Sequence, residues 1–384
     1  MNVAFDGMAV ANFQQVVYDL STQSGAYGND WDLGALFRLI VNQIFVVHGD
    51  QRDMFRLVTL LDRSTNMQVS KGQDRLYALM HLAGDYEEGR IIVDYNKTEE
   101  QVMADAIAYH ISQHRDLEFL VSCFRDVETT YPSWIPEGWM GGKPTGLGFP
   151  RRYDHELKPT KCSLNSVAVG DLRLSIRGVR VGWVQQYLLS NLTIFETVAG
   201  FWASPFGEHI HSYLGDINTG LPLEISRVFN AGIDRGSHNH QSIQTGLSYL
   251  WEIGSIPEQA SRALDFGGEA IPDLLAPLKN SNKLAWSALR AVLLQSVGRS
   301  YIVTTNKHFG QVPECNIREE DEIWLVLGCP LPVVVRRQPD GSYSHICPAR
   351  IPAFERHTNI ASFVSGIQPG DRIGEWTVQD IELK

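Results

Sequence analysis

The chain has 384 residues, a formal net charge of −11, 43% hydrophobic residues and 20% charged residues. These proportions are typical of a soluble globular protein with a sizeable core. The acidic balance argues against nucleic acid as the main partner, because phosphate binding needs a basic surface.

The first residues carry no sign of export or membrane insertion. Residues 1–15 lack the basic start and the apolar run of a signal peptide. No stretch approaches the roughly 18 apolar residues of a membrane-spanning helix, and the longest, Leu36–Val47, is interrupted by polar residues. We therefore expect a cytoplasmic protein that has no membrane partner.

Residues 1–130 are predicted to be largely helical. Apolar residues recur at helical spacing in three segments. These are Leu36–Val47, Phe55–Leu61 and Leu76–Ala83. Each pattern predicts a helix that buries one apolar face.

A further helix is predicted after Thr98, which is placed to act as its N-cap. Glu99 and Glu100 fall in its first turn, where negative charge complements the helix dipole. His110 and His114 lie further along the same helix. We interpret these two histidines as helix-surface or helix-end residues and not as ligands.

Residues 131–150 are rich in proline, glycine and tryptophan, which favours an extended connector over a helix. The next part, residues 151–297, is predicted to be mixed and mainly helical. Alternation over Leu172–Ile176 predicts a strand there. Helices are expected at Gln185–Trp202, Ile243–Ile253, Pro257–Leu264 and Lys283–Val297.

Residues 298–384 are predicted to be β-rich. Short apolar or β-branched runs are separated by turn residues such as Pro339–Gly341. The runs are Ser300–Thr305, Glu322–Gly328, Pro332–Arg336 and Tyr343–Ile346. The expected fold class is therefore α+β, with largely helical N-terminal and central parts and a C-terminal antiparallel β-sheet or small barrel. We expect the parts to form one compact unit.

Four local signatures, in order along the chain, resemble the fungal heterokaryon-incompatibility (HET) family in the region downstream of its HET domain. They are Gln73–Leu79, Val93–Thr98, Tyr131–Pro136 and the stretch from Gly298 to Arg336 that contains Glu320–Cys329. Together they span roughly residues 60 to 350, which is most of the chain. Each signature alone is weak, whereas four in register make a specific pattern.

Two departures from the family pattern limit what the resemblance implies. Residues 1–60 lack the tryptophan–glycine core of the HET domain, so we expect no activity inherited from that domain. The family's glycine- and tyrosine-rich ending is replaced by Cys347–Pro352. Some stand-alone HET-like proteins belong to fungal biosynthetic pathways. The chain is similar to the norbornene-forming Diels–Alderases of sordarin-type terpenoid biosynthesis.

Two His-x-His pairs are the residues with the spacing closest to that of metal ligands. His209–His211 and His238–His240 would each turn two imidazoles to one side of a strand. Nothing else has metal-ligand spacing, so we predict no metal. We interpret His209 and His238 as hydrogen-bond donors or general acids in a pocket.

Motifs for covalent or cofactor chemistry are missing. There is no Gly-x-Ser-x-Gly elbow and no dinucleotide fingerprint, and Gly141–Gly146 lacks the spacing of a phosphate-binding loop. The five cysteines are an odd number without a Cys-x-x-Cys pair, which favours reduced thiols. We therefore predict an activity that needs no cofactor.

Aromatic residues gather in the middle of the chain, interleaved with histidine, acidic residues and arginine. This mixture is typical of an apolar small-molecule pocket with a few hydrogen-bond donors. We expect the pocket to be lined by Trp183, Trp202, Phe206 and Tyr213. The residues expected to supply hydrogen bonds are His209, His238 and Arg235.

Two functions are compatible with these observations. In the first, the chain is a cofactor-free pericyclase that catalyses an intramolecular Diels–Alder cycloaddition of an apolar terpenoid, because such an enzyme needs a shaped cavity and carbonyl-polarising donors but no nucleophile. In the second, it is a regulatory or interaction module of incompatibility signalling. A closed pocket would favour the first function, and a flat surface or groove the second.

Overall fold

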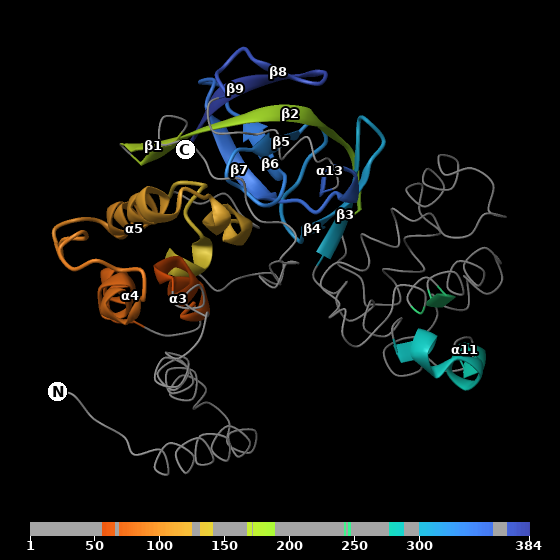
Figure 1. Ribbon diagram of the computed structural model, residues 1–384, viewed down its shortest axis with the longest axis horizontal. Helices are drawn as coiled ribbons and strands as arrows, with labels where there is room; N and C mark the ends of the chain where they lie inside the picture. Colours follow the sequence, from red (N-terminus) through yellow and green to blue (C-terminus); the bar gives the residue numbers. More distant parts are fainter. Residues whose placement is uncertain are drawn as a thin grey trace, which may run out of the picture. The chain divides into compact units, whose positions relative to one another are not determined.

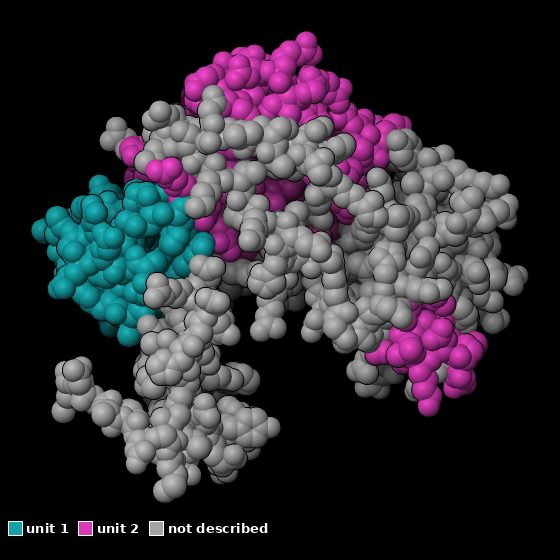
Figure 2. All heavy atoms as spheres, in the orientation of Figure 1, with its two compact units in different colours: residues 1–114, 135–144 teal, residues 115–134, 145–384 magenta. Residues whose placement is uncertain are grey.

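The computed structural model describes residues 56–65, 69–124, 131–140, 167–170, 172–188, 242, 245–246, 276–287, 299–355 and 367–384 (Figure 1). The chain forms two compact units (Figure 2). Unit 1 contains residues 1–114 and 135–144, and unit 2 contains residues 115–134 and 145–384. Helices dominate the described part of unit 1 and strands that of unit 2, which confirms the α+β prediction.

Unit 1 is built from short helices around an apolar core. They are α3 (Leu57–Arg63), α4 (Gly72–Leu79), η3 (Met80–Leu82), α5 (Glu99–His114) and η5 (Glu137–Met140). The predicted apolar face of α4 is confirmed, because Leu76, Leu79 and Met80 are buried. Polar side chains tie the helices together as well. Arg75 donates from Nη1 to the carbonyl oxygen of Ser64, and the buried Trp139 donates from its ring nitrogen to Asp62.

Helix α5 begins directly after Thr98, so the predicted N-cap position is confirmed. His114 is the last residue of α5, as expected. The interpretation of His110 as a surface or end residue is wrong, since its side chain is only 1% exposed in the core of unit 1. The reason is that α5 buries a wide face, which includes Ala106, Ile107 and Ile111 on either side of His110.

Unit 2 is organised around a mostly antiparallel sheet. Its strands are β1 (Val167–Gly170), β2 (Arg173–Leu188), β3 (Arg299–Thr304), β4 (Phe309–Pro313), β5 (Glu322–Val326), β6 (Val333–Arg337), β7 (Tyr343–Pro348), β8 (Arg372–Ile373) and β9 (Trp376–Leu383). Short helices accompany them, among them η4 (Glu118–Ser122), α11 (Ala276–Ser281) and α13 (Pro352–Glu355). The four β-runs expected beyond residue 298 all form strands, and β4, β8 and β9 are additional.

Five of these strands pair in a closed ring. Strand β2 pairs with β5, β5 with β6, β6 with β7, β7 with β9, and β9 again with β2. The contact between β7 and β9 is parallel and joins Tyr343 to Leu383, whereas the other four pairings are antiparallel. The expected small barrel is therefore present. Closing the ring removes the free edges that an open sheet would expose.

Strand β2 is the longest strand and takes part in most of the sheet (Figure 1). Its first half pairs with β9, its middle with β5 and its last residues with β3. The strand expected at Leu172–Ile176 is confirmed by β2. The expectation that a helix begins at Gln185 is wrong, because Gln185–Leu188 continue β2 alongside β3. Inter-strand hydrogen bonds outweigh the weak local preference of these residues.

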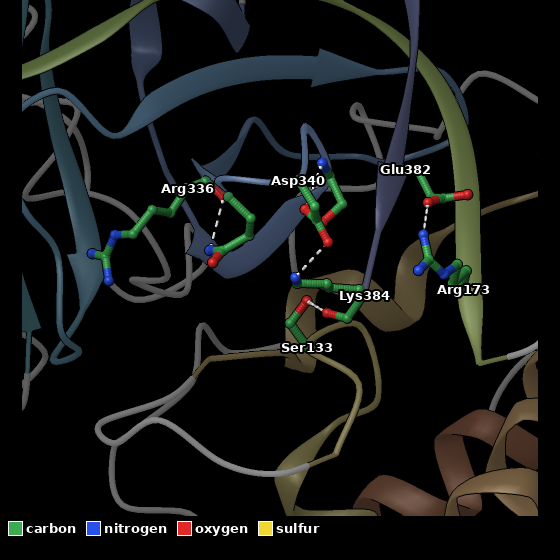
Figure 3. Close-up of polar contacts among 8 residues, drawn as sticks. Ser133, Arg173, Arg336, Asp340, Glu382 and Lys384 are labelled. Atoms are coloured by element: carbon green, nitrogen blue, oxygen red, sulfur yellow. Dashed lines mark hydrogen bonds and ion pairs between the residues drawn. The ribbon is translucent and has the colours of Figure 1, made fainter.

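Residues of the predicted connector are held against the barrel of unit 2. The main-chain oxygen of Lys384 accepts a hydrogen bond from the Ser133 N–H at 2.9 Å and another from the Ser133 hydroxyl (Figure 3). The Lys384 ammonium lies 2.9 Å from the Asp340 carboxylate. Trp134, next to Ser133, is fully buried and donates from its ring nitrogen to the carbonyl oxygen of Leu172. The segment around Ser133 is therefore fixed to Lys384 at the C-terminus and, through Trp134, to Leu172.

No helix in the described ranges is both long enough and apolar enough to cross a lipid bilayer.

Candidate functional site

Of the seven predicted site residues, Trp183 lies in the described part of the chain. Trp202, Phe206, His209, Tyr213, Arg235 and His238 lie outside it. Trp183 is located near the C-terminal end of β2, and its side chain is 39% exposed. The candidate site therefore consists of Trp183 and the described residues around it.

Two irregularities in the pairing of β2 flank Trp183. The register with β5 shifts between Arg180 and Gly182, and the register with β3 shifts between Val184 and Gln186. Each shift is a β-bulge, which adds a residue to one strand, bends it and changes the direction of nearby side chains. Trp183 thus lies where β2 leaves β5 and joins β3. Bulges are common beside functional sites because they aim side chains that a regular strand could not.

Contacts with the β3–β4 hairpin fix the backbone at Trp183. The Trp183 N–H donates to the hydroxyl oxygen of Thr305 at 3.2 Å, and the Thr305 N–H donates to the Trp183 carbonyl oxygen at 2.9 Å. The Asn306 side-chain amide donates to the carbonyl oxygen of Val181 at 2.7 Å. Because both the N–H and the carbonyl oxygen of Trp183 bond to Thr305, the backbone that carries the Trp183 ring has a fixed position.

Arg180 lies against the Trp183 ring. The guanidinium carbon is 4.5 Å from the centroid of the Trp183 ring, within the range of a cation–π contact. Arg180 also approaches Glu322, with Nη1 3.4 Å from Oε1 of the carboxylate. The Arg180 side chain is 35% exposed, so part of it is accessible to solvent. The arginine thus joins an exposed aromatic ring to a buried carboxylate.

Glu322 is the buried anion of this group, with a side chain that is 7% exposed. Its Oε2 accepts a hydrogen bond from the ring nitrogen of the fully buried Trp324 at 2.9 Å. Burial raises the pKa of the neighbouring Tyr343, and the negative charge of Glu322 acts in the same direction. We call Arg180, Trp183, Glu322 and Trp324 the Arg180–Trp183 site.

The Arg180–Trp183 site offers two chemical features side by side. The Trp183 ring is a large apolar surface on which a flat or polyene ligand can stack. The guanidinium of Arg180 has five N–H donors, so it can donate to a ligand oxygen in addition to Glu322. An apolar ring beside a cationic donor is chemically suited to a ligand that is mainly apolar and carries a carbonyl or carboxylate group.

The sequence pattern points to Trp183 but gives no indication of Arg180 and Glu322. Arg180 is three residues before Trp183, an odd spacing that places the two on opposite faces of a regular strand. The bulge between Arg180 and Gly182 changes this relationship. Glu322 is the cross-strand partner of Trp183 in the sheet. The register that joins the two residues depends on pairing between segments far apart in the sequence.

No protein-family model matches the chain, and no match was found among curated proteins or solved structures.

Proposed function

We propose that the chain is a cofactor-free biosynthetic cyclase of the HET-like type, which acts in the cytoplasm on an apolar terpenoid. Its reaction is an intramolecular Diels–Alder cycloaddition. In this reaction a conjugated diene and an alkene of the same molecule form two new carbon–carbon σ bonds and consume two π bonds. No atom is gained or lost and no electron is exchanged with another reactant. The enzyme therefore has to supply orientation and polarisation only.

The observation that carries the proposal is the contact between Arg180 and Trp183 at the end of β2. The Trp183 ring gives the terpenoid an apolar surface against which diene and alkene can be held close together. The Arg180 guanidinium, 4.5 Å from that ring, is placed to donate a hydrogen bond to a carbonyl conjugated with the alkene. Negative charge grows on that oxygen in the transition state, so a fixed donor lowers the barrier.

Glu322 has a positioning role in this proposal. Its carboxylate is fixed by the Trp324 ring nitrogen at 2.9 Å and lies 3.4 Å from Arg180. A guanidinium that is already oriented loses less conformational freedom when it binds a carbonyl. Trp202, Phe206 and Tyr213 are proposed to complete the apolar wall, and His209, His238 and Arg235 to supply further donors.

The test is turnover of candidate substrates. A panel of apolar polyene and terpenoid aldehydes is screened for a raised melting temperature. Ligands that bind are then incubated with the protein and separated by chromatography coupled to mass spectrometry. The expected product has the same mass as its substrate but a different retention time. Its formation is faster with protein than without it, and it does not depend on added metal or nucleotide.

Variants of the Arg180–Trp183 site provide the specific comparison. Trp183→Ala is expected to lower kcat/KM about tenfold, which corresponds to the loss of about 1.4 kcal/mol of aromatic contact. Arg180→Lys is expected to lower kcat by roughly 10- to 100-fold, because the fixed planar donor is lost. Matched controls on the same strand are Tyr187→Ala, which changes an aromatic residue of 38% exposure, and Arg173→Lys, which changes an exposed ion pair.

Two outcomes would contradict the proposal. One is no acceleration of cyclisation across the panel. The other is an acceleration that Trp183→Ala and Arg180→Lys leave at the level of the two control variants. The second result would contradict the assignment of catalysis to the Arg180–Trp183 site, and the next variants to test would be those of the other predicted residues.

An interaction module of incompatibility signalling is the second candidate, and one observation favours it. Apolar side chains in the segment before α5 are strongly exposed: Ile92 by 73%, Val93 by 48% and Tyr95 by 50%. Exposed apolar patches often bind other proteins. Capture of a purified HET domain by the chain, lost in Ile92→Ser and Tyr95→Ser variants, together with no turnover, would favour this function over the cyclase.

A further inference from the structure

In unit 1, an aspartate and two histidines lie close together, although the aspartate is 29 residues before the second histidine. Asp85 lies in the segment between η3 and α5, and His110 and His114 lie on α5. Within the described residues, these three form a group whose potential ligand atoms all lie within 4.8 Å of one another. We propose that Asp85, His110 and His114 bind a divalent transition-metal ion, with Zn²⁺ as the reference ion.

The two histidines have the geometry of a helical metal-binding pair. They are four residues apart, so both side chains lie on one face of α5, about one turn apart. Their ring centroids are 4.9 Å apart with an angle of 36° between the ring planes. Rings in this relationship can turn one nitrogen each toward a shared ion with small changes of side-chain torsion.

Asp85 supplies the third ligand from a fixed position. Its Oδ1 accepts a hydrogen bond from the Leu57 N–H at 2.9 Å, and its Oδ2 lies 2.6 Å from Nε2 of His114. The Tyr109 hydroxyl donates to the main-chain oxygen of Asp85, and it accepts from the Glu87 N–H at 2.9 Å. Outer hydrogen bonds that orient a ligand carboxylate are a regular feature of metal sites and raise their affinity.

The distances are compatible with ion binding. Zn²⁺ bonds to histidine nitrogen and carboxylate oxygen are about 2.0 Å long, so ligand atoms in a tetrahedral site lie roughly 3.3 Å apart. The observed separations run from 2.6 Å between Asp85 and His114 to the 4.8 Å limit of the group. Binding therefore requires the first pair to separate and the wider pair to approach, each within reach of side-chain rotation.

Burial and access also suit an ion. The His110 side chain is buried at 1% exposure, while His114 and Asp85 remain 19% and 12% exposed. His110 thus fixes the site in the core, whereas the partial exposure of His114 and Asp85 gives an ion access from solvent. Two imidazoles and one carboxylate favour Zn²⁺, Co²⁺ or Ni²⁺ over Mg²⁺, which prefers a shell of oxygen ligands. Three protein ligands leave a further position for water.

The proposed ion site is separate from the proposed cyclase chemistry. Its residues belong to unit 1, whereas the Arg180–Trp183 site belongs to unit 2. A Diels–Alder cycloaddition needs no metal, so either proposal can fail while the other holds. The expected role of the ion is to join the Asp85 segment, α5 and the start of α3, all of which meet at this group.

The experiment is a Zn²⁺ titration of the full chain after removal of metal and of any affinity tag. Isothermal calorimetry measures the number of bound ions, and Co²⁺ substitution reports the coordination through its visible spectrum. Because the chain has 12 histidines, the decisive quantity is the difference between variants. His114→Ala and Asp85→Asn are each expected to remove one Zn²⁺ equivalent, or to weaken its binding by more than about tenfold.

The matched control is His81→Ala, which removes an exposed histidine of unit 1 whose ring contacts Tyr86 and not the metal-binding group. It is expected to keep the full Zn²⁺ stoichiometry and the Zn²⁺-dependent rise in melting temperature. Circular dichroism of each metal-free variant verifies folding, and the two ligand variants provide independent readings if one of them fails to fold. Equal Zn²⁺ binding by the unaltered chain and by both ligand variants, or no Zn²⁺ binding by the unaltered chain, would overturn the proposal.

Discussion

Thr98 and Gln101 exchange hydrogen bonds at the N-terminus of α5. The Thr98 N–H donates to the side-chain oxygen of Gln101 at 2.9 Å, and the Gln101 N–H donates to the Thr98 hydroxyl oxygen at 3.3 Å. This reciprocal arrangement is a capping box, which satisfies two backbone donors that a helix start would otherwise leave without a partner. It fixes the first turn of the helix that carries His110 and His114.

Thr98→Ala is expected to lower the free energy of unfolding by about 1 kcal/mol, because the N-cap acceptor is lost. Urea denaturation followed by far-ultraviolet circular dichroism measures the change. Thr98→Ser is the matched control, since it keeps the hydroxyl, and it should recover most of the loss. Equal stability of the alanine and serine variants would contradict the role of the capping box.

Two ion pairs of unit 2 are expected to differ sharply in their contribution to stability. Arg336 binds Asp321 through two hydrogen bonds of 2.8 Å, and Asp321 is 3% exposed. The pair of Arg173 and Glu382, by contrast, has side chains that are 49% and 45% exposed (Figure 3). Arg336→Met should cost about 3 kcal/mol, because it leaves a buried carboxylate without its cation.

Arg173→Met should cost less than about 1 kcal/mol, since exposed ion pairs contribute little. Thermal and chemical denaturation of the two variants gives the comparison directly. The double variant Asp321→Asn/Arg336→Met should be more stable than Arg336→Met alone, because the uncompensated charge is then removed. A larger loss from the exposed pair than from the buried pair would refute this assignment.

Gly178 is placed where β2 passes close to β5. A Cβ at this position would collide with the main-chain oxygen of Leu325. Gly178→Ala therefore has to displace one of the two strands and is expected to destabilise unit 2 by about 1–3 kcal/mol. The matched control is Gly170→Ala, where no atom lies within 4 Å of the added methyl group. A thermal melt should show a lower melting temperature for the first variant only.

Two buried thiols of unit 2, those of Cys329 and Cys347, are expected to be unreactive in the folded protein. Burial raises the pKa of Cys329 to about 12, and burial followed by hydrogen bonding with Cys315 raises that of Cys347. The thiolate is the reactive form, so labelling with a thiol reagent near pH 8 should be slow at both residues until the protein unfolds. Peptide mass spectrometry after native and denaturing labelling identifies which residues react.

The same pKa shifts set a dependence of stability on pH. The folded-state pKa of each thiol lies above its unfolded value of about 8.5, so the folded state holds these protons more strongly. The contribution is fully present below about pH 8.5 and is lost as the pH rises toward the folded value of about 12 for Cys329. Cys329→Ala should weaken this alkaline loss. An unchanged slope between pH 8.5 and pH 11 would show that other groups cause it.

The elements of the fold were predictable wherever local pattern and tertiary environment agree. Alternation around Leu172–Ile176 predicts β2, and the threonine before two glutamates predicts the start of α5. Strand β4 is not predictable from its sequence, because Phe309–Pro313 contains glycine and proline and lacks alternation. The strand character of Gln185–Leu188 comes from pairing with β3, which local sequence does not contain.

The candidate sites were less predictable because each depends on residues far apart in the sequence. The aromatic character of Trp183 is visible in the sequence, but its contact with Arg180 depends on a bulge in β2. The spacing of His110 and His114 was visible as four residues on one helix. Their third partner, Asp85, lies 29 residues before His114, and the hydrogen bond that fixes it comes from Leu57. Only the packed structure brings these residues to one place.

The closed ring of strands has a consequence for how the chain folds during synthesis. Strand β2 pairs along one side with β9, and the ion pair between Arg173 and Glu382 joins residues 209 positions apart. At about 5–20 residues per second, a ribosome needs at least ten seconds or so to make β9 after β2 has been made. During that interval the edge of β2 that pairs with β9 is unpaired. We therefore expect the nascent chain to bind chaperones through this strand. The high sequence separation of these contacts also predicts slow barrel closure on refolding from denaturant.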